Sequence, residues 1–182
     1  RHHPDFYPAF VMNHILGGGG FESRLTTEVR EARGLTYGIG SSLSTIDGAP
    51  MILASSQLSA GRVAEALEVI REEWARMARE GVTQEELDDA KTYLTGSFPL
   101  RFTSTDRIAS MLVGIQIEGL GIDWFDTRND EVEAVTLEQV NAIAAQLLDP
   151  DRLLVVVAGP REPDLRIDEE LDAAILLDAA LA

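Results

Sequence analysis

Residues 15–39 read ILGGGGFESRLTTEVREARGLTYGI, with four consecutive glycines before a dense run of charge. A flexible linker predicts a change of composition and serine neighbours, whereas helical patterns border these glycines on both sides. A phosphate-binding loop predicts a preceding strand and a Gly-Lys-Ser/Thr ending, whereas here a helix precedes and Glu22 would repel an anion. Gly17, Gly18, Gly19 and Gly20 therefore predict either a tight turn between helices or a loop that touches a substrate.

The charged run ends in a second candidate feature, the pair Arg30 and Tyr37. Arg30 lies near the end of a helix expected over residues 21–33, with Gly34 as its cap, and Tyr37 begins a strand. The intervening glycine turn can bring both side chains to one place, where a guanidinium and a phenol donate hydrogen bonds to a carbonyl oxygen or oxyanion. A purely structural role is also open, with Arg30 compensating the helix dipole beside a half-buried tyrosine.

The rest of the chain predicts an α+β fold in which helices pack on one face of a largely antiparallel sheet. A helix over 4–16 precedes the glycines, and two β-rich runs around Asp47-Gly48 predict a hairpin. Helical stretches follow, and capping boxes mark two of their starts. The expected hairpin strands lie at 35–45 and 51–59. The first of the later helices is expected to begin at a cap on Ser59 and to end at Gly81. The others are expected from the capping box Thr83–Glu86 to about Leu94, over about 105–118, over about 123–134, and from the capping box Thr136–Gln139 to Leu148.

Residues 152–159, RLLVVVAG, are a continuous apolar run that predicts a strand buried on both faces. Such a strand needs neighbours on both sides, but only one hairpin is visible. We therefore expect at least one strand N-terminal to Arg1, in a longer polypeptide. Residues 1–160 are expected to form one domain, and the acidic residues 161–182 a tail or a final helix.

Composition excludes several classes of function. The 182 residues include 31 acidic and 15 basic side chains, for a net charge of -16, which disfavours nucleic acid and anionic membranes as partners. No apolar run reaches the ~20 residues needed to span a bilayer. The chain has no cysteine, so it offers no disulfide, thiolate metal site or cysteine nucleophile.

The histidines and serines predict no catalytic centre within this chain. His2 and His3 are adjacent, and His14 is alone on a mostly apolar helix. Neither HExxH nor HxxEH spacing occurs, so no metal site is expected. Pairs of serines in the expected strands have no nearby histidine to activate them.

Together, these motifs resemble the C-terminal, non-catalytic domain of the pitrilysin-type zinc metallopeptidases, which include the mitochondrial processing peptidases. The stretch NHILGGGGFESRLTTEVREARGLTYGIGSSLS matches in order an Asn-x-x-Leu-Gly-Gly helix end, a Ser-Arg-Leu helix start, an arginine, and Gly-Leu-x-Tyr. The segments SAGRVAEALEVIREEWARMAREGVTQEELDDAKTYLTGSF and VTLEQVNAIAAQLLDPDRLLVVVAGP resemble the long helix with its G-V-T-x-x-E-L turn and the closing helix and strand. The resemblance covers about residues 4–160.

The resemblance implies that two homologous domains close around an extended peptide. The partner domain would hold zinc through an HxxEH helix, so this chain alone should be inactive and should carry no cofactor. Arg30 and Tyr37 match the arginine and tyrosine that reach the substrate beside the zinc. Gly17 to Gly20 resemble the start of a glycine-rich substrate loop, here much shortened.

The resemblance also allows other roles. Family members serve as inert structural subunits of a respiratory complex, and a domain with an exposed strand edge can bind peptides without cleaving them. The compartment stays open; a soluble protein of the bacterial periplasm or cytoplasm is the expectation.

Overall fold

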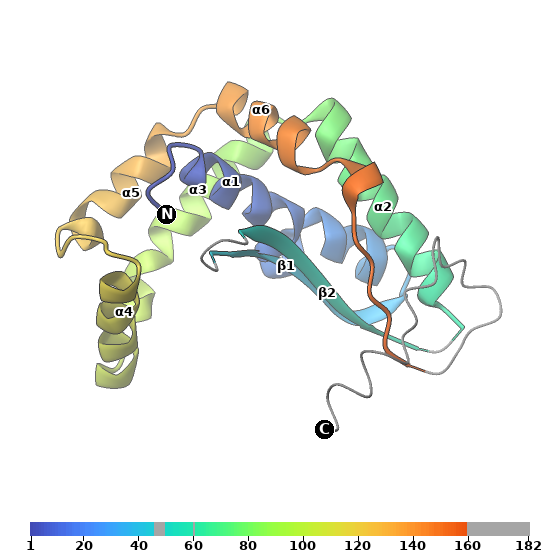
Figure 1. The fold of residues 1–182 in the computed structure, drawn as a ribbon, viewed down its shortest axis with the longest axis horizontal. Coiled ribbons are helices and arrows are strands. Elements are labelled where there is room, and N and C mark those ends of the chain that lie inside the picture. Colours follow the sequence, from blue (N-terminus) through green and yellow to red (C-terminus); the bar gives the residue numbers. More distant parts are fainter. Residues whose placement is uncertain (46–49, 60, 160–182) are drawn as a thin grey trace.

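A computed structural model of the chain describes residues 1–45, 50–59 and 61–159. Helices form an arch over a two-stranded antiparallel hairpin (Figure 1), which confirms the predicted α+β class. None of the described helices is long and apolar enough to cross a membrane. The turn predicted at Asp47-Gly48 and the tail or helix predicted over 161–182 lie outside the described residues.

The N-terminal third forms the centre of the arch. Helix α1, Phe6–Asn13, continues into a π-helical turn, His14–Gly18, which brings the first glycines against the sheet. A 3₁₀ turn, Gly20–Glu22, and a second π-helical segment, Thr26–Glu31, follow. Ser23 interrupts the helix that the sequence predicted over 21–33, because its backbone is extended and its hydroxyl donates to the Gly20 carbonyl.

The hairpin pairs β1, Thr36–Ser44, with β2, Met51–Leu58. Ser44 opposes Met51 at the turn end, and Thr36 opposes Leu58 at the other. One extra residue on β1 between Thr36 and Ile39 makes a β-bulge.

Five longer helices form the rest of the arch, and the predicted capping boxes are present at Thr83–Glu86 and Thr136–Gln139. Arg62, not Ser59, is the N-cap of the longest helix, and it makes no side-chain cap bond. The Ser59 carbonyl accepts a hydrogen bond from the Arg62 amide at 3.1 Å. The bounds are α2 Val63–Glu80, α3 Gln84–Gly96, α4 Thr105–Ile117, α5 Trp124–Ala134 and α6 Leu137–Leu147, with 3₁₀ turns at Phe98–Phe102 and Pro150–Arg152.

The core lies between α1, α2, α3, α6 and the start of β1. Its fully buried side chains come mostly from the apolar faces that periodicity predicts. Leu25 and Val29, four residues apart, share one such face, and the stripe on α2 includes Trp74 and Met77.

The prediction of a buried strand over 152–159 is wrong for this structure. Residues 153–158 are irregular, and Leu154 and Val156 are 75% and 74% exposed. The described residues pair no strand with this segment, so it has no ladder to join.

Candidate functional site

A left-handed turn at Gly34 joins the segment that carries Arg30 to the strand that carries Tyr37. Gly34 has φ +59°, and its amide donates to the Arg30 carbonyl at 2.9 Å. The Leu35 amide donates to the Val29 carbonyl at 2.9 Å, and both side chains are buried. This closed turn fixes how the helix end and the strand start sit relative to each other.

Arg30 is half-buried and stacks on an aromatic ring. Its guanidinium carbon lies 4.6 Å from the centroid of Phe21, which is itself mostly exposed. Stacking of this kind covers the face of a guanidinium and not the N–H donors at its edge.

Tyr37 is 97% exposed and lies at the β1 bulge. The Thr36 hydroxyl accepts a hydrogen bond from the Gly38 amide at 3.1 Å and lies 2.6 Å from the Gln57 carbonyl. The Ser56 hydroxyl donates a hydrogen bond of 2.9 Å to the Thr36 hydroxyl. Bulges change the direction in which the backbone projects its side chains, and these hydroxyl contacts hold the backbone on both sides of Tyr37.

The four glycines have different environments. A Cβ on Gly17 would lie 2.8 Å from the Ser41 amide nitrogen, so Gly17 lets the helix end touch β1. A Cβ on Gly19 would lie 2.9 Å from the His14 carbonyl, whereas Gly20 has open space and φ +67°. Gly17 is buried, and Gly18, Gly19 and Gly20 reach the surface. The run is a tight turn, and only its last three residues are accessible to another molecule.

Two neighbouring arginines have structural partners. Arg24 donates through Nε and Nη2 to the two carboxylate oxygens of Glu86 at 2.6 and 2.7 Å. Burial alone would raise the pKa of Glu86, but hydrogen bonds from Arg24 and Thr83 outweigh it and lower the pKa. Arg33 donates to the Glu28 carbonyl and carboxylate. Sequence reasoning missed the Arg24 link because its partner is 62 residues away.

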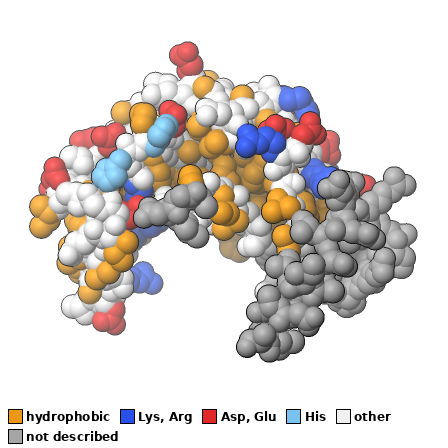
Figure 2. All heavy atoms as spheres, in the orientation of Figure 1, with side chains coloured by type: hydrophobic (Ala, Val, Ile, Leu, Met, Phe, Trp, Pro, Cys, Tyr) orange, Lys and Arg blue, Asp and Glu red, His pale blue; other side chains and the backbone are white. Residues whose placement is uncertain are grey.

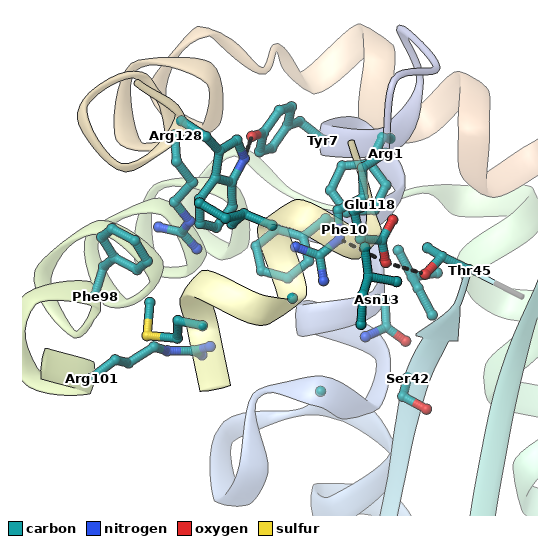
Figure 3. A pocket seen from close by; sticks show the side chains of 18 of the residues that line it. Arg1, Tyr7, Phe10, Asn13, Ser42, Thr45, Phe98, Arg101, Glu118 and Arg128 are labelled. Carbon is teal, nitrogen blue, oxygen red and sulfur yellow. Dashed lines mark hydrogen bonds and ion pairs between the residues drawn. The ribbon is translucent and has the colours of Figure 1, made fainter. Parts of the chain in front are cut away.

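A cavity of about 590 Å³ lies between α1, β1, α4 and α5 (Figure 3). Neither Arg30 nor Tyr37 lines it. Trp124 Nε1 donates to the Tyr7 hydroxyl at 3.0 Å, and the Glu118 carboxylate accepts from Thr45 at 2.8 Å. Desolvation raises the pKa of Tyr7. The aromatic side chains that line the cavity are Phe6, Tyr7, Phe10, Phe98 and Trp124.

Two buried polar groups border the same cavity. Asn13 Oδ1 has no hydrogen-bond partner among the residues that the structure describes. The Arg128 guanidinium lies 4.5 Å from the Phe98 ring centroid and donates to the Leu94 carbonyl at the end of α3, and burial lowers its pKa. The lining suits an apolar or aromatic group. No sequence pattern indicated this cavity, because its rings come from helices far apart in the chain.

The described residues do not fit a metal ion. Within residues 1–45, 50–59 and 61–159, no group of three or more His, Cys, Asp or Glu side chains could hold one. His14 is half-buried, stacks on Tyr93 with ring centroids 5.1 Å apart, and has a pKa lowered by burial. Its role is packing.

Comparison with known proteins decides the family. The sequence model described as the Peptidase M16 inactive domain matches residues 1–94. The chain belongs to the M16 peptidase family. A zinc protease of Bacillus subtilis, YmxG, is 32% identical over 86% of this chain and 38% of its own length. A zinc protease of Mycobacterium leprae is 33% identical over 84% of this chain and 34% of its own length.

Solved structures agree with this assignment of the M16 domain. The peptidase M16 inactive domain of Pseudomonas fluorescens superposes with a TM-score of 0.71 at 33% identity, over 84% of this chain and 36% of that one. An inactive peptidase domain from Bordetella parapertussis gives a TM-score of 0.72 at 19% identity, over 90% of this chain and 88% of that one, which shows the shared fold. The M16 domain thus spans little more than a third of the length of its curated relatives.

Proposed function

We propose that this M16 domain is the non-catalytic, substrate-binding half of a zinc metalloendopeptidase. The observation that supports the proposal is the Gly34 turn, which joins the segment that carries the half-buried Arg30 to the strand that carries the almost fully exposed phenol of Tyr37. Membership of a family of zinc proteases supports it.

Arg30 and Tyr37 would bind the carbonyl oxygen of the scissile region and stabilise the oxyanion that forms there. Each preorganised donor of this kind contributes roughly 3 kcal/mol to the transition state. The stacking of Arg30 on Phe21 supports preorganisation of the guanidinium, and the bulge fixes the backbone from which Tyr37 projects. The partner would be an HxxEH domain, on the same polypeptide or another, that holds the zinc, with an extended peptide between the two.

The test is kinetic and uses the domain assembled with its HxxEH partner. Arg30→Ala and Tyr37→Phe should each lower kcat by roughly 10²–10³-fold, with little change in melting temperature. Arg33→Ala is the matched control, since its guanidinium is bonded to Glu28. Unchanged kcat in both variants would contradict the proposed role of Arg30 and Tyr37.

A second candidate function is an inert scaffold or peptide-binding domain. A relative in Helicobacter pylori, 27% identical over 88% of this chain, bears the name Non-peptidase homolog YmxG. A scaffold would purify without an HxxEH protein, and a peptide-binding domain would retain extended peptides in the presence of a zinc chelator. Zinc-dependent cleavage by the assembled protein would exclude both.

A further inference from the structure

The aromatic cavity between α1, β1, α4 and α5 is lined by a buried arginine that has no carboxylate partner among the described residues. Arg128 is 4% exposed, and none of the described ion pairs includes it. Its Nη1 donates to the Leu94 carbonyl at 2.8 Å and to Asn129 Oδ1 at 2.7 Å, which are both neutral acceptors. The carbonyl end of α3 supplies only a partial negative charge. A buried cation without an anion costs free energy, so an anion beside Arg128 would be bound favourably.

One edge of the Arg128 guanidinium is available to such an anion. The guanidinium carbon lies 4.5 Å from the Phe98 ring centroid and 5.5 Å from the Phe10 ring centroid, so the rings lie against its face. Nε and Nη2 make no hydrogen bond with any described residue. These two nitrogens form the edge of a guanidinium that a carboxylate binds through two parallel hydrogen bonds.

Two further polar groups of the lining have unused hydrogen-bonding capacity. The Tyr7 hydroxyl accepts from Trp124 Nε1, and no described acceptor takes the phenolic proton. Asn13 is 7% exposed, and its Oδ1 receives no hydrogen bond from any described donor. Figure 3 shows Arg128 and Asn13 on different sides of the cavity. The cavity therefore offers donors at Arg128 and Tyr7 and an acceptor at Asn13.

The lining is basic although the chain is strongly acidic. Among the described residues, Arg1, Arg101 and Arg128 line the cavity with one carboxylate, Glu118, whose Oε1 lies 3.6 Å from Arg1 Nε. The whole chain has a net charge of -16. In Figure 2 hydrophobic side chains gather on the concave side of the arch, and acidic ones lie mainly on its outer rim. A volume of about 590 Å³ is in the range of sites that bind small organic molecules.

We propose that this cavity binds an aromatic carboxylate, with the carboxylate on Arg128 Nε and Nη2, the ring among the aromatic side chains, and a hydroxyl or amide N–H donating to Asn13 Oδ1. A free aromatic acid and the C-terminal aromatic residue of a peptide share this chemistry. A purely apolar ligand would leave Arg128 without an anion, and a cationic ligand would be repelled by it. The proposal does not depend on any role for Arg30 and Tyr37, neither of which lines the cavity.

The first experiment is a calorimetric titration of the 182-residue chain with three compounds that contain the same ring. The para-hydroxyphenylpropionate probe has both a carboxylate and a hydroxyl group, phenylpropionate lacks the hydroxyl group, and tyramine has an ammonium group in place of the carboxylate. Loss of the hydroxyl group should raise Kd about fivefold, and replacement of the carboxylate should raise it at least about tenfold. Equal binding of the hydroxy acid and tyramine, or no binding of the hydroxy acid at millimolar concentration, would overturn the proposal.

Variants that fill the cavity or change its charge locate the binding. Gly114 lines the cavity on α4, and an added Cβ would have open space there, so Gly114→Leu should occupy the cavity and abolish binding. Gly96→Leu is the matched control, because Gly96 also has open space and does not line the cavity. Arg101→Gln should weaken binding of both acids, whereas Arg107→Gln, at an exposed position of α4 outside the lining, should not. A folded Gly114→Leu chain that binds the hydroxy acid as tightly as the parent would contradict the proposal.

Two variants test the individual contacts. Arg128→Met should remove the preference for the hydroxy acid over tyramine. Asn13→Ala should remove the difference in Kd between the hydroxy acid and phenylpropionate. Since Arg128 is buried, its variant can fail to fold, and Arg101→Gln then tests the same preference for an anion from an exposed position. An unchanged preference in the folded variants would overturn the assigned contacts.

The second experiment separates the two sources of the carboxylate and uses a polypeptide of the relatives' length that contains residues 1–182. The peptide Ala-Ala-Tyr is compared with its C-terminal amide and with the hydroxy acid. A peptide source predicts that Ala-Ala-Tyr binds as tightly as the hydroxy acid and that the amide does not bind. A free acid predicts that only the hydroxy acid binds. Loss of hydroxy acid binding in the longer polypeptide would show that residues outside 1–182 fill the cavity and would overturn the proposal.

Discussion

At the scale of single residues, the hydroxyl of Thr36 holds the backbone next to Tyr37. Thr36→Val keeps the shape of the side chain but removes the hydroxyl contacts to Gly38, Gln57 and Ser56. We expect a loss of about 1–2 kcal/mol in unfolding free energy and a lower kcat in the assembled enzyme, because the bulge is no longer held. Urea titration and single-turnover kinetics measure the two effects.

Thr27→Val serves as the control for Thr36→Val, since Thr27 is exposed in the preceding segment. It should change neither quantity. If the Thr36→Val enzyme is less stable but has an unchanged kcat, Thr36 contributes to stability and not to turnover.

Gly17 is predicted to be the least replaceable glycine of the run. An added methyl group would meet the Ser41 backbone at 2.8 Å, so Gly17→Ala should cost about 1–3 kcal/mol through overpacking. Gly114→Ala, in open space within α4, should instead raise stability by roughly 0.5–1 kcal/mol. Denaturant titrations measure the unfolding midpoints of the two variants. Equal midpoints would show that the close approach to Ser41 is not why position 17 requires glycine.

His14 gives the domain a dependence of stability on pH. Burial lowers the pKa of its imidazole below the ordinary 6.5, so the unfolded chain takes up a proton at a higher pH than the folded one. Stability should therefore fall as the pH drops through about 6.5 and on towards the folded pKa. His14→Gln should show a smaller loss over this range in thermal melts, while His3→Gln, at an exposed site, should match the parent. An unchanged pH profile in His14→Gln would assign the dependence to other groups.

At the scale of elements, the ion pair between Arg24 and Glu86 ties the segment before the Gly34 turn to the start of α3. Both side chains are less than a third exposed, and Arg24 also donates to the Gly81 carbonyl at 3.0 Å. Arg24→Ala should lower stability by roughly 2–3 kcal/mol, because it leaves a half-buried carboxylate without its partner. Folding lowers the pKa of Glu86, so its carboxylate stabilises the folded state at any pH above the pKa that Glu86 has in the unfolded chain. This stabilisation is lost as the pH falls through the pKa that Glu86 has in the folded chain.

A double-mutant cycle measures this coupling. Arg24→Ala with Glu86→Ala should be less destabilised than the sum of the two single variants. Additive losses would show that the two side chains act independently. Arg62→Ala is the control, because its ion pair with Glu65 is exposed.

The same elements show what sequence can predict. Capping boxes at Thr83 and Thr136 and the apolar stripe of α2 are local signals, and the structure confirms them. The Arg24 ion pair and the aromatic cavity join residues far apart in the chain, so no local pattern reports them. The strand predicted over 152–159 failed for a related reason: a strand is defined by its neighbour, and apolar composition alone supplies none.

At the candidate site, the sequence predicted the pair Arg30 and Tyr37 and the Gly34 turn between them. The structure adds that Phe21 supports the guanidinium and that a bulge precedes Ile39. Neither feature could be predicted from the sequence. A bulge depends on the register between two strands, and the stacking depends on how the fold brings Phe21 and Arg30 together. The catalytic role of the pair stays a prediction.

At the scale of the whole molecule, the proposed function assigns the zinc to a partner domain and not to this chain, which leads to a testable prediction. A ligand that binds only the folded state raises the melting temperature by mass action. The described residues contain no cluster that could hold a metal, so a zinc salt or a chelator should leave the melting temperature of the 182-residue chain unchanged. The chelator should instead abolish peptide cleavage by the assembled enzyme, because the proposed function assigns the metal to an HxxEH partner. Differential scanning fluorimetry and a peptide-cleavage assay measure the two responses, with calcium as the ionic control. A zinc-specific rise of several degrees in the isolated chain would place a metal site in this domain and contradict the proposed division.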